Sequence, residues 1–198
     1  MSLRRLKTRT PHVSRRILVF GALLVGIGIY GIVLSIAPFA LPIDSASVEA
    51  ALQKTPAVGE NRLYIAKIGV NVPINEVIGG NDTKALLDGA AHRAPESGNP
   101  KDGGNFVLAA HRFTFGITPR NVVQQSPFLH IEKLTIGDDI YVDWAGKRYN
   151  YKVHSTGNVA PTQTEIEQRT ASPILTMYSC GLAGERDNRL VVVAVPAQ

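Results

Sequence analysis

The chain has 198 residues, of which 44% are hydrophobic and 19% charged, and its formal net charge is +5. This length allows one domain with its own hydrophobic core and an additional segment. Six of the 21 basic residues lie before residue 17, where there is no acidic residue, which leaves 15 basic against 16 acidic residues in the remainder, a net charge of −1. The basic excess is confined to the N-terminus, so the main part of the chain lacks the charge of a nucleic-acid-binding protein.

The 25 residues from Ile17 to Leu41 contain no charged side chain. A helix of this length, at about 1.5 Å per residue, exceeds the ~30 Å thickness of the hydrocarbon core of a bilayer. A cleaved secretory signal also begins with basic residues, but its apolar region has only about 7 to 15 residues, and no small-residue cleavage site follows this segment closely. We therefore predict an uncleaved transmembrane signal anchor at 17–41.

The basic residues that precede this helix determine its expected orientation. Residues 1–16 form a basic tail that the positive-inside rule places in the cytoplasm, which leaves the rest of the chain outside the cell. The polar residues 42–61 contain Pro42, Pro56 and Gly59, and we predict a linker with a short helix near Ser47 to Gln53.

Residues 62–198 have the pattern of a β-rich domain. We predict short helical turns at 82–87, 127–134 and 162–168, a hairpin turn at Ala145-Gly146, and short strands at 63–68, 70–77, 105–111, 140–144, 149–153, 173–180 and 190–195. Seven or eight short strands in one domain must close their sheet or stack two sheets. We predict a closed, mostly antiparallel β-barrel.

Cys180, the only cysteine, ends an apolar strand-forming segment, and Arg189 opens the next one after turn-forming residues at 181–188. Two strands joined in this way are expected to be antiparallel neighbours, which brings the thiol near the guanidinium. A lone cysteine is usually a small buried residue, and an arginine at a strand end is usually solvated. However, a single thiol cannot form a disulfide within an exported domain, so it either pairs with another chain or is kept reactive.

His111 ends the predicted strand at 105–111, and strand ends of a barrel gather at its rim. We therefore expect His111, Cys180 and Arg189 to share one site. His92 also precedes an arginine, but loop-forming residues follow it. His130 and His154 fit no zinc pattern, and the carboxylates of Asp138, Asp139, Asp143 and Glu165 are interpreted as solvated turn charges. We predict neither a metal site nor another cofactor.

Four segments resemble motifs of the sortases, the cysteine transpeptidases of bacterial cell surfaces. Residues 176–180 (TMYSC) are similar to T-L-x-T-C, residues 105–112 (NFVLAAHR) to a strand ending in A-G-H-R, residues 189–192 (RLVV) to the arginine of the last strand, and residues 88–92 with Pro95 to G-x-G-H-x-P. The resemblance extends from Leu63 to Val195. Met177, Ser179 and Ala110 stand where the family usually has Leu, Thr and Gly, which leaves the subclass open, with classes D and E the most similar.

The resemblance implies a sortase-like barrel of seven to eight strands and a role for each site residue. Cys180 would attack a peptide carbonyl to form a thioester, His111 would act as acid and base, and Arg189 would stabilise the oxyanion. His92, Thr176 and Ser179 are expected near the site. The implied partners are secreted proteins with an LPxTG-like C-terminal sorting motif and an amine acceptor, either on a peptidoglycan precursor or on a pilin.

Two other functions remain compatible with these residues. A chymotrypsin-like cysteine protease also has its histidine before its cysteine, but residues 178–181 only half match the expected nucleophile loop. A membrane-tethered β-domain without catalytic activity would bind a partner and use Cys180 as a core residue. Alkylation of the folded protein by a thiol reagent separates this last possibility from the two enzymes.

Overall fold

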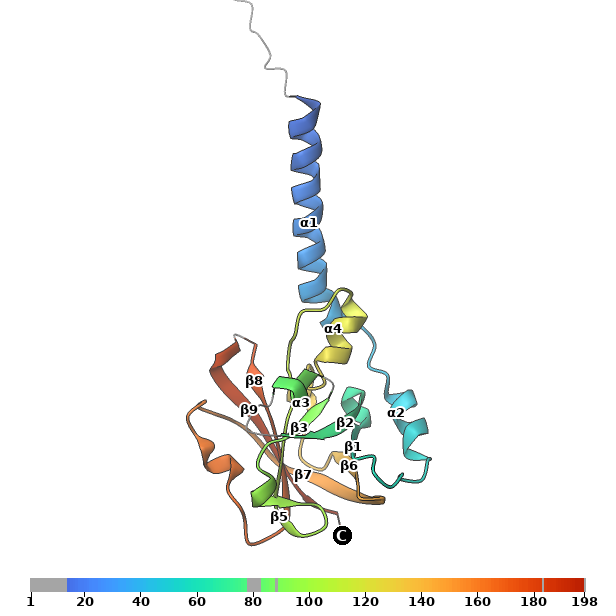
Figure 1. Ribbon diagram of the computed structural model, residues 1–198, viewed down its shortest axis with the longest axis vertical. Helices are drawn as coiled ribbons and strands as arrows, with labels where there is room; N and C mark the ends of the chain where they lie inside the picture. Colours follow the sequence, from blue (N-terminus) through green and yellow to red (C-terminus); the bar gives the residue numbers. More distant parts are fainter. Residues whose placement is uncertain (1–13, 78–82, 88, 183, 198) are drawn as a thin grey trace, which may run out of the picture.

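The computed structural model describes residues 14–77, 83–87, 89–182 and 184–197 (Figure 1). The strands are β1 (Arg62–Ile65), β2 (Val70–Glu76), β3 (Ala90–His92), β4 (Gly98–Asn99), β5 (Gly103–Ala109), β6 (Asp139–Trp144), β7 (Lys147–Val159), β8 (Ile174–Gly181) and β9 (Gly184–Pro196). The α-helices are α1 (Arg15–Ala40), α2 (Ser45–Leu52), α3 (Thr83–Leu87) and α4 (Pro119–Gln125), and the 3-10 turns are η1 (Ala66–Ile68), η2 (Pro95–Ser97), η3 (Ile131–Lys133) and η4 (Thr164–Glu167).

The strands close into a barrel. Neighbouring strands follow the order β3-β2-β1-β6-β7-β9-β8-β5, and pairing between β3 and β5 joins the two ends, while the short β4 adds to β5. The pairs β2–β3 and β5–β8 are parallel and the other pairs are antiparallel. The described strands therefore confirm the predicted closed barrel of mostly antiparallel strands with short helices.

Alternate residues of the strands fill the barrel. Leu63, Phe106, Leu108, Ile140 and Met177 are at most 1% exposed and belong to one apolar cluster. The connection between β5 and β6 adds Phe128, Ile131 and Leu134 to this cluster. Because each fully buried side chain of this size contributes about 1.5 to 3 kcal/mol, the interior is the main source of stability of the domain.

A second, smaller cluster lies on the outer face of β5, β8 and β9. It contains Val107, Ala109, Tyr178 and Val191, and Ile166 from the connection between β7 and β8 packs against it. Strands that are covered on both faces are expected to consist of continuous apolar residues, which is the pattern of residues 106–110 and 190–195. The connection between β7 and β8 thus covers part of the outside of the barrel.

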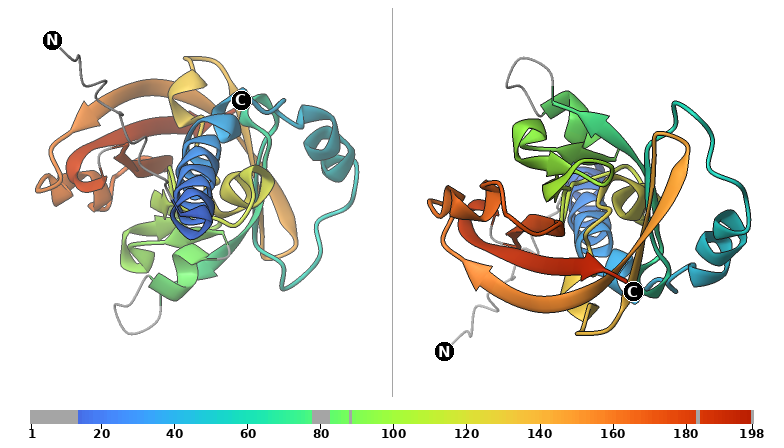
Figure 2. Two further views of the ribbon diagram at one scale, coloured as in Figure 1. Left: turned by 90° about the horizontal axis from the view of Figure 1, so that it is seen from above. Right: turned by 90° about the horizontal axis from the view of Figure 1, so that it is seen from below.

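Helix α1 projects away from the barrel, and only its last turns approach it (Figures 1 and 2). Its apolar side chains are exposed, and by length and composition the helix is able to cross a membrane. It begins at Arg15, where the Ser14 side chain accepts a hydrogen bond from the Ile17 N–H. The predicted cytoplasmic tail lies largely outside the described residues, including its basic residues Arg4, Arg5, Lys7 and Arg9.

The segment between α1 and β1 is attached to the domain along its length. Val48 of α2 is 1% exposed. Arg148 of β7 donates to the carbonyl of Leu52 and to that of Lys54 (3.1 Å), and it forms an ion pair with Asp143 (2.7 Å). The short helix expected in this segment is therefore present as α2, which packs on the barrel and whose end is bound by the Arg148 guanidinium.

Several elements differ from the sequence predictions, among them Ala66–Ile68, which form the 3-10 turn η1 and not the end of a strand, and β3, which was not predicted. Helix α4 was not predicted, although Thr118 caps it and Pro119 occupies its first turn. Strand β7 continues to Val159, and β9 begins at Gly184, within the predicted loop at 181–188. The extension of β7 follows from its pairing with β9, in which Ser155 to Val159 lie opposite Val193 to Arg189 and the pairing overrides the weak strand propensity of polar residues. The start of β9 instead pairs with β8, where Gly184 lies opposite Gly181.

The interior packing predicts a large difference between two leucine truncations. Leu108→Ala should lower the free energy of unfolding by about 2 to 5 kcal/mol, because Leu108 is fully buried and its loss leaves a cavity. Leu87→Ala is the matched control, since the Leu87 side chain is 54% exposed, and its effect should stay within about 0.5 kcal/mol. Urea denaturation measures both values, and equal effects would contradict the proposed position of the core.

Candidate active site

The pairing of β8 with β9 sets Cys180 directly opposite Arg189. Directly opposed residues of an antiparallel pair have their Cβ atoms about 4.5 to 5.5 Å apart and their side chains on the same face of the sheet. Both residues are partly buried, and Cys180 is a free thiol. The expected juxtaposition of thiol and guanidinium is therefore present, but Arg189 lies inside β9 and does not open it.

His111 follows the end of β5, on the other side of β8. Strand β5 is parallel to β8, with Ala109 opposite Tyr178, and the Ala110 N–H donates to the Tyr178 carbonyl (3.4 Å). If this register is continued by two residues on each strand, from Ala109 to His111 and from Tyr178 to Cys180, His111 lies beside Cys180. Ala110 still faces the interior cluster, so alternation assigns His111 to the outer face. The three predicted residues thus come from three adjacent strands, at one end and on one face.

The backbone at His111 is fixed to the core. Its carbonyl accepts a hydrogen bond from the Phe128 N–H (3.0 Å), and the Phe128 side chain is fully buried in the barrel. The side chain of His111 is partly buried. A histidine on a strand extension, tied in this way to a buried residue, has a defined position at the rim while its ring stays accessible.

Tyr178 lies beneath Arg189 on the same face. The Arg189 guanidinium carbon is 5.1 Å from the centre of the Tyr178 ring, within the range of a cation–π contact. The Arg189 Nε atom is buried and, among the described residues, has no hydrogen-bond partner. The ring therefore supports a guanidinium with an unused donor beside the thiol.

The hydroxyl of Tyr178 connects two distant segments. It donates to the Glu167 carboxylate and accepts from Arg93 Nε (3.0 Å), and Arg93 Nε lies 3.5 Å from Glu167 Oε1. Burial raises the pKa of Tyr178, and the hydrogen bond to Glu167 and its negative charge raise it further, against the opposing charges of Arg93 and Arg189. Tyr178 therefore stays neutral at physiological pH and donates its proton to Glu167.

The contacts among Tyr178, Glu167 and Arg93 were not predicted from the sequence. Tyr178 is two residues from Cys180, so the alternation of a strand was a sufficient signal for a shared face. Arg93 and Glu167 are separated from it by 85 and 11 residues in the chain, and no pattern linked them.

The remaining predicted residues divide between the two faces of the sheet. Thr176 is 2% exposed and shares the outer face with Tyr178 and Cys180 by alternation. Ser179 is opposite Leu190, which packs against the interior, and its hydroxyl donates to the Cys180 carbonyl (3.2 Å). The Ser179 hydroxyl therefore contacts the backbone of the cysteine, on the opposite face from the thiol.

His92 is buried inside the barrel. It is opposite Leu108 and 2% exposed, and its ring meets Phe106 edge-on at 4.8 Å. Nδ1 lies 3.0 Å from Glu76 Oε1 and Nε2 lies 3.1 Å from the Gly98 carbonyl. Since a carbonyl only accepts, Nε2 carries a hydrogen in this contact. His92 therefore holds β3 to its neighbours and does not join the three residues on the outer face.

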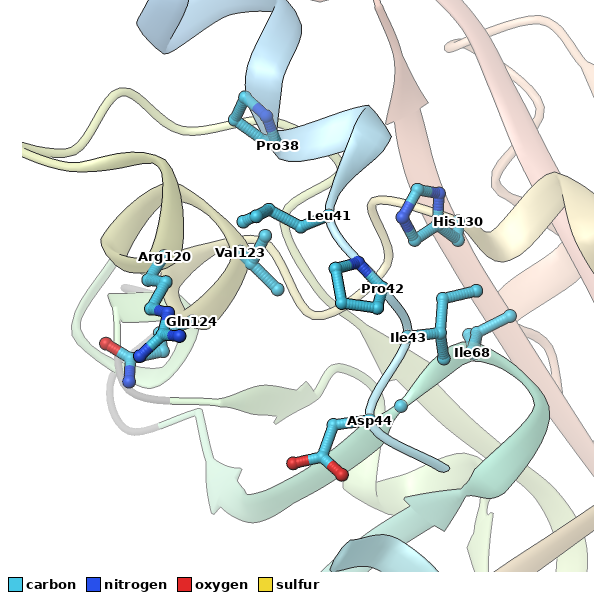
Figure 3. Close-up of a pocket in the computed structure, with 11 residues that line it drawn as sticks. Pro38, Leu41, Pro42, Ile43, Asp44, Ile68, Arg120, Val123, Gln124 and His130 are labelled. Atoms are coloured by element: carbon cyan, nitrogen blue, oxygen red, sulfur yellow. The ribbon is translucent and has the colours of Figure 1, made fainter. Parts of the chain in front are cut away.

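The other titratable residues that the sequence suggested have structural partners or lie elsewhere. Asp138 pairs with Lys67 (2.7 Å), and Asp139 with Lys152 (2.8 Å). The described residues contain no cluster of three or more histidine, cysteine or carboxylate side chains with the arrangement of a metal site. His130 lines a cavity of about 530 Å³ between the end of α1, η1 and α4 (Figure 3), and His154 is exposed.

Comparison with known proteins identifies the family. A family model of the sortase domain matches residues 63–197. The chain belongs to the sortase family. Sortases are cysteine transpeptidases of sorting signals, which agrees with an accessible thiol between a histidine and an arginine.

Individual sortases show the same relationship. Sortase SrtE1 of Streptomyces coelicolor is 37% identical over 106 residues, which make up 50% of this chain and only 27% of that protein. Sortase E1 from the same organism, solved with a tripeptide in its active site, is similar with a TM-score of 0.57 and 26% identity over 73% of this chain and 91% of that one. A Sortase D5 transpeptidase of Clostridium perfringens gives a TM-score of 0.57 and 22% identity over 77% and 88% of the two chains, which supports the sortase fold.

The two most buried tyrosines predict a loss of stability in alkali. Burial raises the pKa of Tyr151 to about 12, and that of Tyr178 is also raised. Unfolded tyrosines ionise near pH ~10, so above this pH the unfolded state has released protons that the folded state retains. The free energy of unfolding should therefore fall as the pH rises above about 10, with a loss of about 2 kcal/mol from Tyr151 alone by pH 12.

Urea denaturation at pH values from about 8 to about 12, on both sides of the ordinary tyrosine pKa of ~10, measures this loss. Tyr151→Phe and Tyr178→Phe should each make the decline less steep, because each removes one ionising hydroxyl. A decline that keeps its slope in both variants would show that other groups cause it.

Proposed function

We propose that this sortase is a membrane-anchored cysteine transpeptidase in which Cys180 is the nucleophile, His111 the acid and base, and Arg189 the oxyanion-stabilising residue. The observation that supports these roles is the register of three adjacent strands. Cys180 is directly opposite Arg189, and His111 is level with Cys180 on its other side. Residues that are 69 positions apart in the sequence are thereby collected around the only thiol of the chain.

The chemistry follows from these three groups. A thiolate of Cys180 attacks the carbonyl carbon of a peptide bond, and a tetrahedral intermediate forms whose oxyanion receives hydrogen bonds from the Arg189 guanidinium. His111 gives a proton to the leaving amine, and a thioester remains on Cys180. An incoming amine then loses its proton to His111 as it attacks the thioester, which releases the new amide and restores the Cys180 thiolate and the protonated His111.

Arg189 suits the role of oxyanion donor because of its environment. Its charge is permanent and its planar donors have a fixed geometry. The ring of Tyr178 covers one face of the guanidinium, and the buried Nε retains an unused hydrogen. A donor that is already oriented needs little reorganisation when negative charge develops, which is the condition for effective stabilisation of a transition state.

We further propose that the substrates are secreted proteins with a C-terminal sorting motif similar to LPxTG and that the acceptor is an amine of a peptidoglycan precursor or of a pilin. Family membership supports a sorting signal as substrate. A tripeptide occupies the active site of Sortase E1 from Streptomyces coelicolor, and one similar structure is a pilus-related Sortase C of Group B Streptococcus. Helix α1 would anchor the enzyme in the cell membrane, with its N-terminus in the cytoplasm and the barrel outside.

Replacement of the thiol should abolish catalysis without unfolding the protein. Cys180→Ala should form no thioester with any peptide of a sorting-motif panel, because the nucleophile is absent, while its melting temperature stays near that of the parent. Mass spectrometry of the full-length enzyme in detergent micelles detects the acyl-enzyme. Normal turnover by Cys180→Ala would exclude Cys180 as the nucleophile, whereas a β-domain that only binds a partner predicts no turnover by the parent protein either.

Removal of the planar donors should slow the reaction with the charge retained. We expect Arg189→Lys to lower kcat/KM by about 10² to 10³, or roughly 2.7 to 4 kcal/mol, because one hydrogen bond to the oxyanion is lost. Arg169→Lys, at an exposed arginine outside the site, is the matched control and should leave kcat/KM unchanged. An unaltered kcat/KM in Arg189→Lys would remove Arg189 from the proposed mechanism.

The products distinguish a transpeptidase from a cysteine protease. In the presence of a suitable amine, most of the thioester should be converted to the new amide, whereas a protease would release the free acid in both the presence and absence of the amine. Chromatography with mass detection of both products, over a panel of acceptor amines, measures this ratio.

A further inference from the structure

The segment between His111 and α4 exposes apolar side chains beside the anchor helix. Phe115 is 68% exposed and Ile117 is 80% exposed. Phe113 stacks on Phe39 of α1 at a ring-centre distance of 6.0 Å, and Phe115 meets Phe113 edge-on at 5.1 Å. Figure 1 shows that α4 and its preceding loop lie against the end of α1. Neighbouring exposed residues of this kind indicate a surface that another apolar phase covers.

A hydrogen bond between Tyr30 and Ile117 defines where this segment lies along the axis of α1. The hydroxyl of Tyr30 donates to the Ile117 carbonyl. If the hydrocarbon core begins at Ile17, next to Arg15 and Arg16, its ~30 Å thickness ends about 20 residues later, near residue 37. Tyr30 is then about 10 Å inside the outer boundary, at ~1.5 Å per residue. Ile117 is therefore at the depth of the acyl chains of the outer leaflet.

The backbone of the segment is suited to such a depth. In hydrocarbon, each backbone polar group needs a partner from the protein. The Ile117 carbonyl accepts from Tyr30, and its N–H donates to Asn121 Oδ1 (3.1 Å). Earlier in the segment, the Thr114 N–H donates to Ser126 Oγ (2.9 Å). Side chains of α1, of α4 and of the residue after α4 therefore satisfy these three backbone groups of the segment.

Charged residues around the segment point away from it. Arg120 and Gln124 extend from the side of α4 that faces away from Pro38 (Figure 3). Arg112 forms an ion pair with Glu132 of η3 (3.3 Å). Both arginine side chains therefore extend or pair outside residues 113–117, as expected for charged groups beside a membrane interface.

We infer that residues 113–117 enter the outer leaflet of the membrane that α1 crosses and that Phe115 and Ile117 contact its phospholipid acyl chains. This inference rests on the proposed anchoring role of α1. Because His111 is two residues before Phe113, the inserted segment would hold the histidine end of the site at the membrane surface.

Lipid-dependent fluorescence quenching tests the inference in the full-length protein. In a Cys180→Ala background, single cysteines are introduced by Phe115→Cys, Ile117→Cys, Ile27→Cys or Val58→Cys, labelled with a polarity-sensitive fluorophore and reconstituted in phosphatidylcholine vesicles. A nitroxide is attached to the lipid either near the headgroup end of the acyl chain or near its methyl end. All four side chains are more than half exposed, so no label replaces a buried side chain.

The labels at Phe115 and Ile117 should emit at shorter wavelength and be quenched several-fold more than the label at Val58, most strongly by the shallow nitroxide. Val58 is the matched control, because it is 89% exposed and adjoins the β6–β7 turn at Gly146, away from α1. Ile27, at the middle of α1, should be quenched most strongly by the deep nitroxide.

The label at Ile27 separates the two ways in which the inference can fail. Quenching at Ile27, together with signals at Phe115 and Ile117 that equal the signal at Val58, would overturn membrane entry of residues 113–117 and leave the anchor intact. A lack of quenching at Ile27 would overturn both the anchoring role of α1 and the inference that depends on it.

Discussion

The candidate site depends above all on the antiparallel register between β8 and β9. Cys180 and Arg189 are directly opposed only in this register, and the period of two in a strand means that a slip by one residue would turn one of them to the other face. The register is fixed by burial on both sides of these strands. Met177 and Val192 face the barrel interior, while Tyr178 and Val191 face the outer cluster, so a slipped pairing would exchange buried apolar groups for exposed positions.

The parallel pairing of β5 with β8 adds the histidine to this arrangement. Parallel strands require a long connection, and here the chain between β5 and β8 contains α4, β6 and β7 before it returns. Part of this connection packs its aromatic and aliphatic residues into the barrel, which fixes the backbone at His111 through Phe128. Core packing and the position of the acid–base residue are therefore determined by the same contacts.

The outer cluster has a comparable double function. Tyr178 is buried between the strands and the connection between β7 and β8, and its hydroxyl joins Glu167 to Arg93. The same ring lies under the guanidinium of Arg189. Stabilisation of this connection and orientation of the proposed oxyanion donor thus share one side chain, and on the other side of the site the segment after His111 contacts α1 through Phe113.

The amino-acid sequence by itself determined the features that depend on local pattern. The charge-free segment at 17–41 predicted the long apolar helix, the alternation of apolar residues predicted a closed barrel, and the motifs around His111, Cys180 and Arg189 predicted which residues meet. The strand at Leu63 and the hairpin at Ala145-Gly146 were also recognisable, because strand propensity and turn chemistry agree there, whereas Ala66–Ile68, predicted as strand, form a 3-10 turn.

Only the tertiary structure decided which face each residue occupies and which distant segments meet. His92 and Ser179 have the motif positions of site residues, yet they face the interior, because β3 and β8 turn those positions inward. Arg93, Glu167 and the contact of Tyr30 with Ile117 had no local signal, since each joins segments that the chain order keeps apart. Local preferences act over a few residues, whereas strand register and the burial of both faces are properties of the closed barrel as a whole.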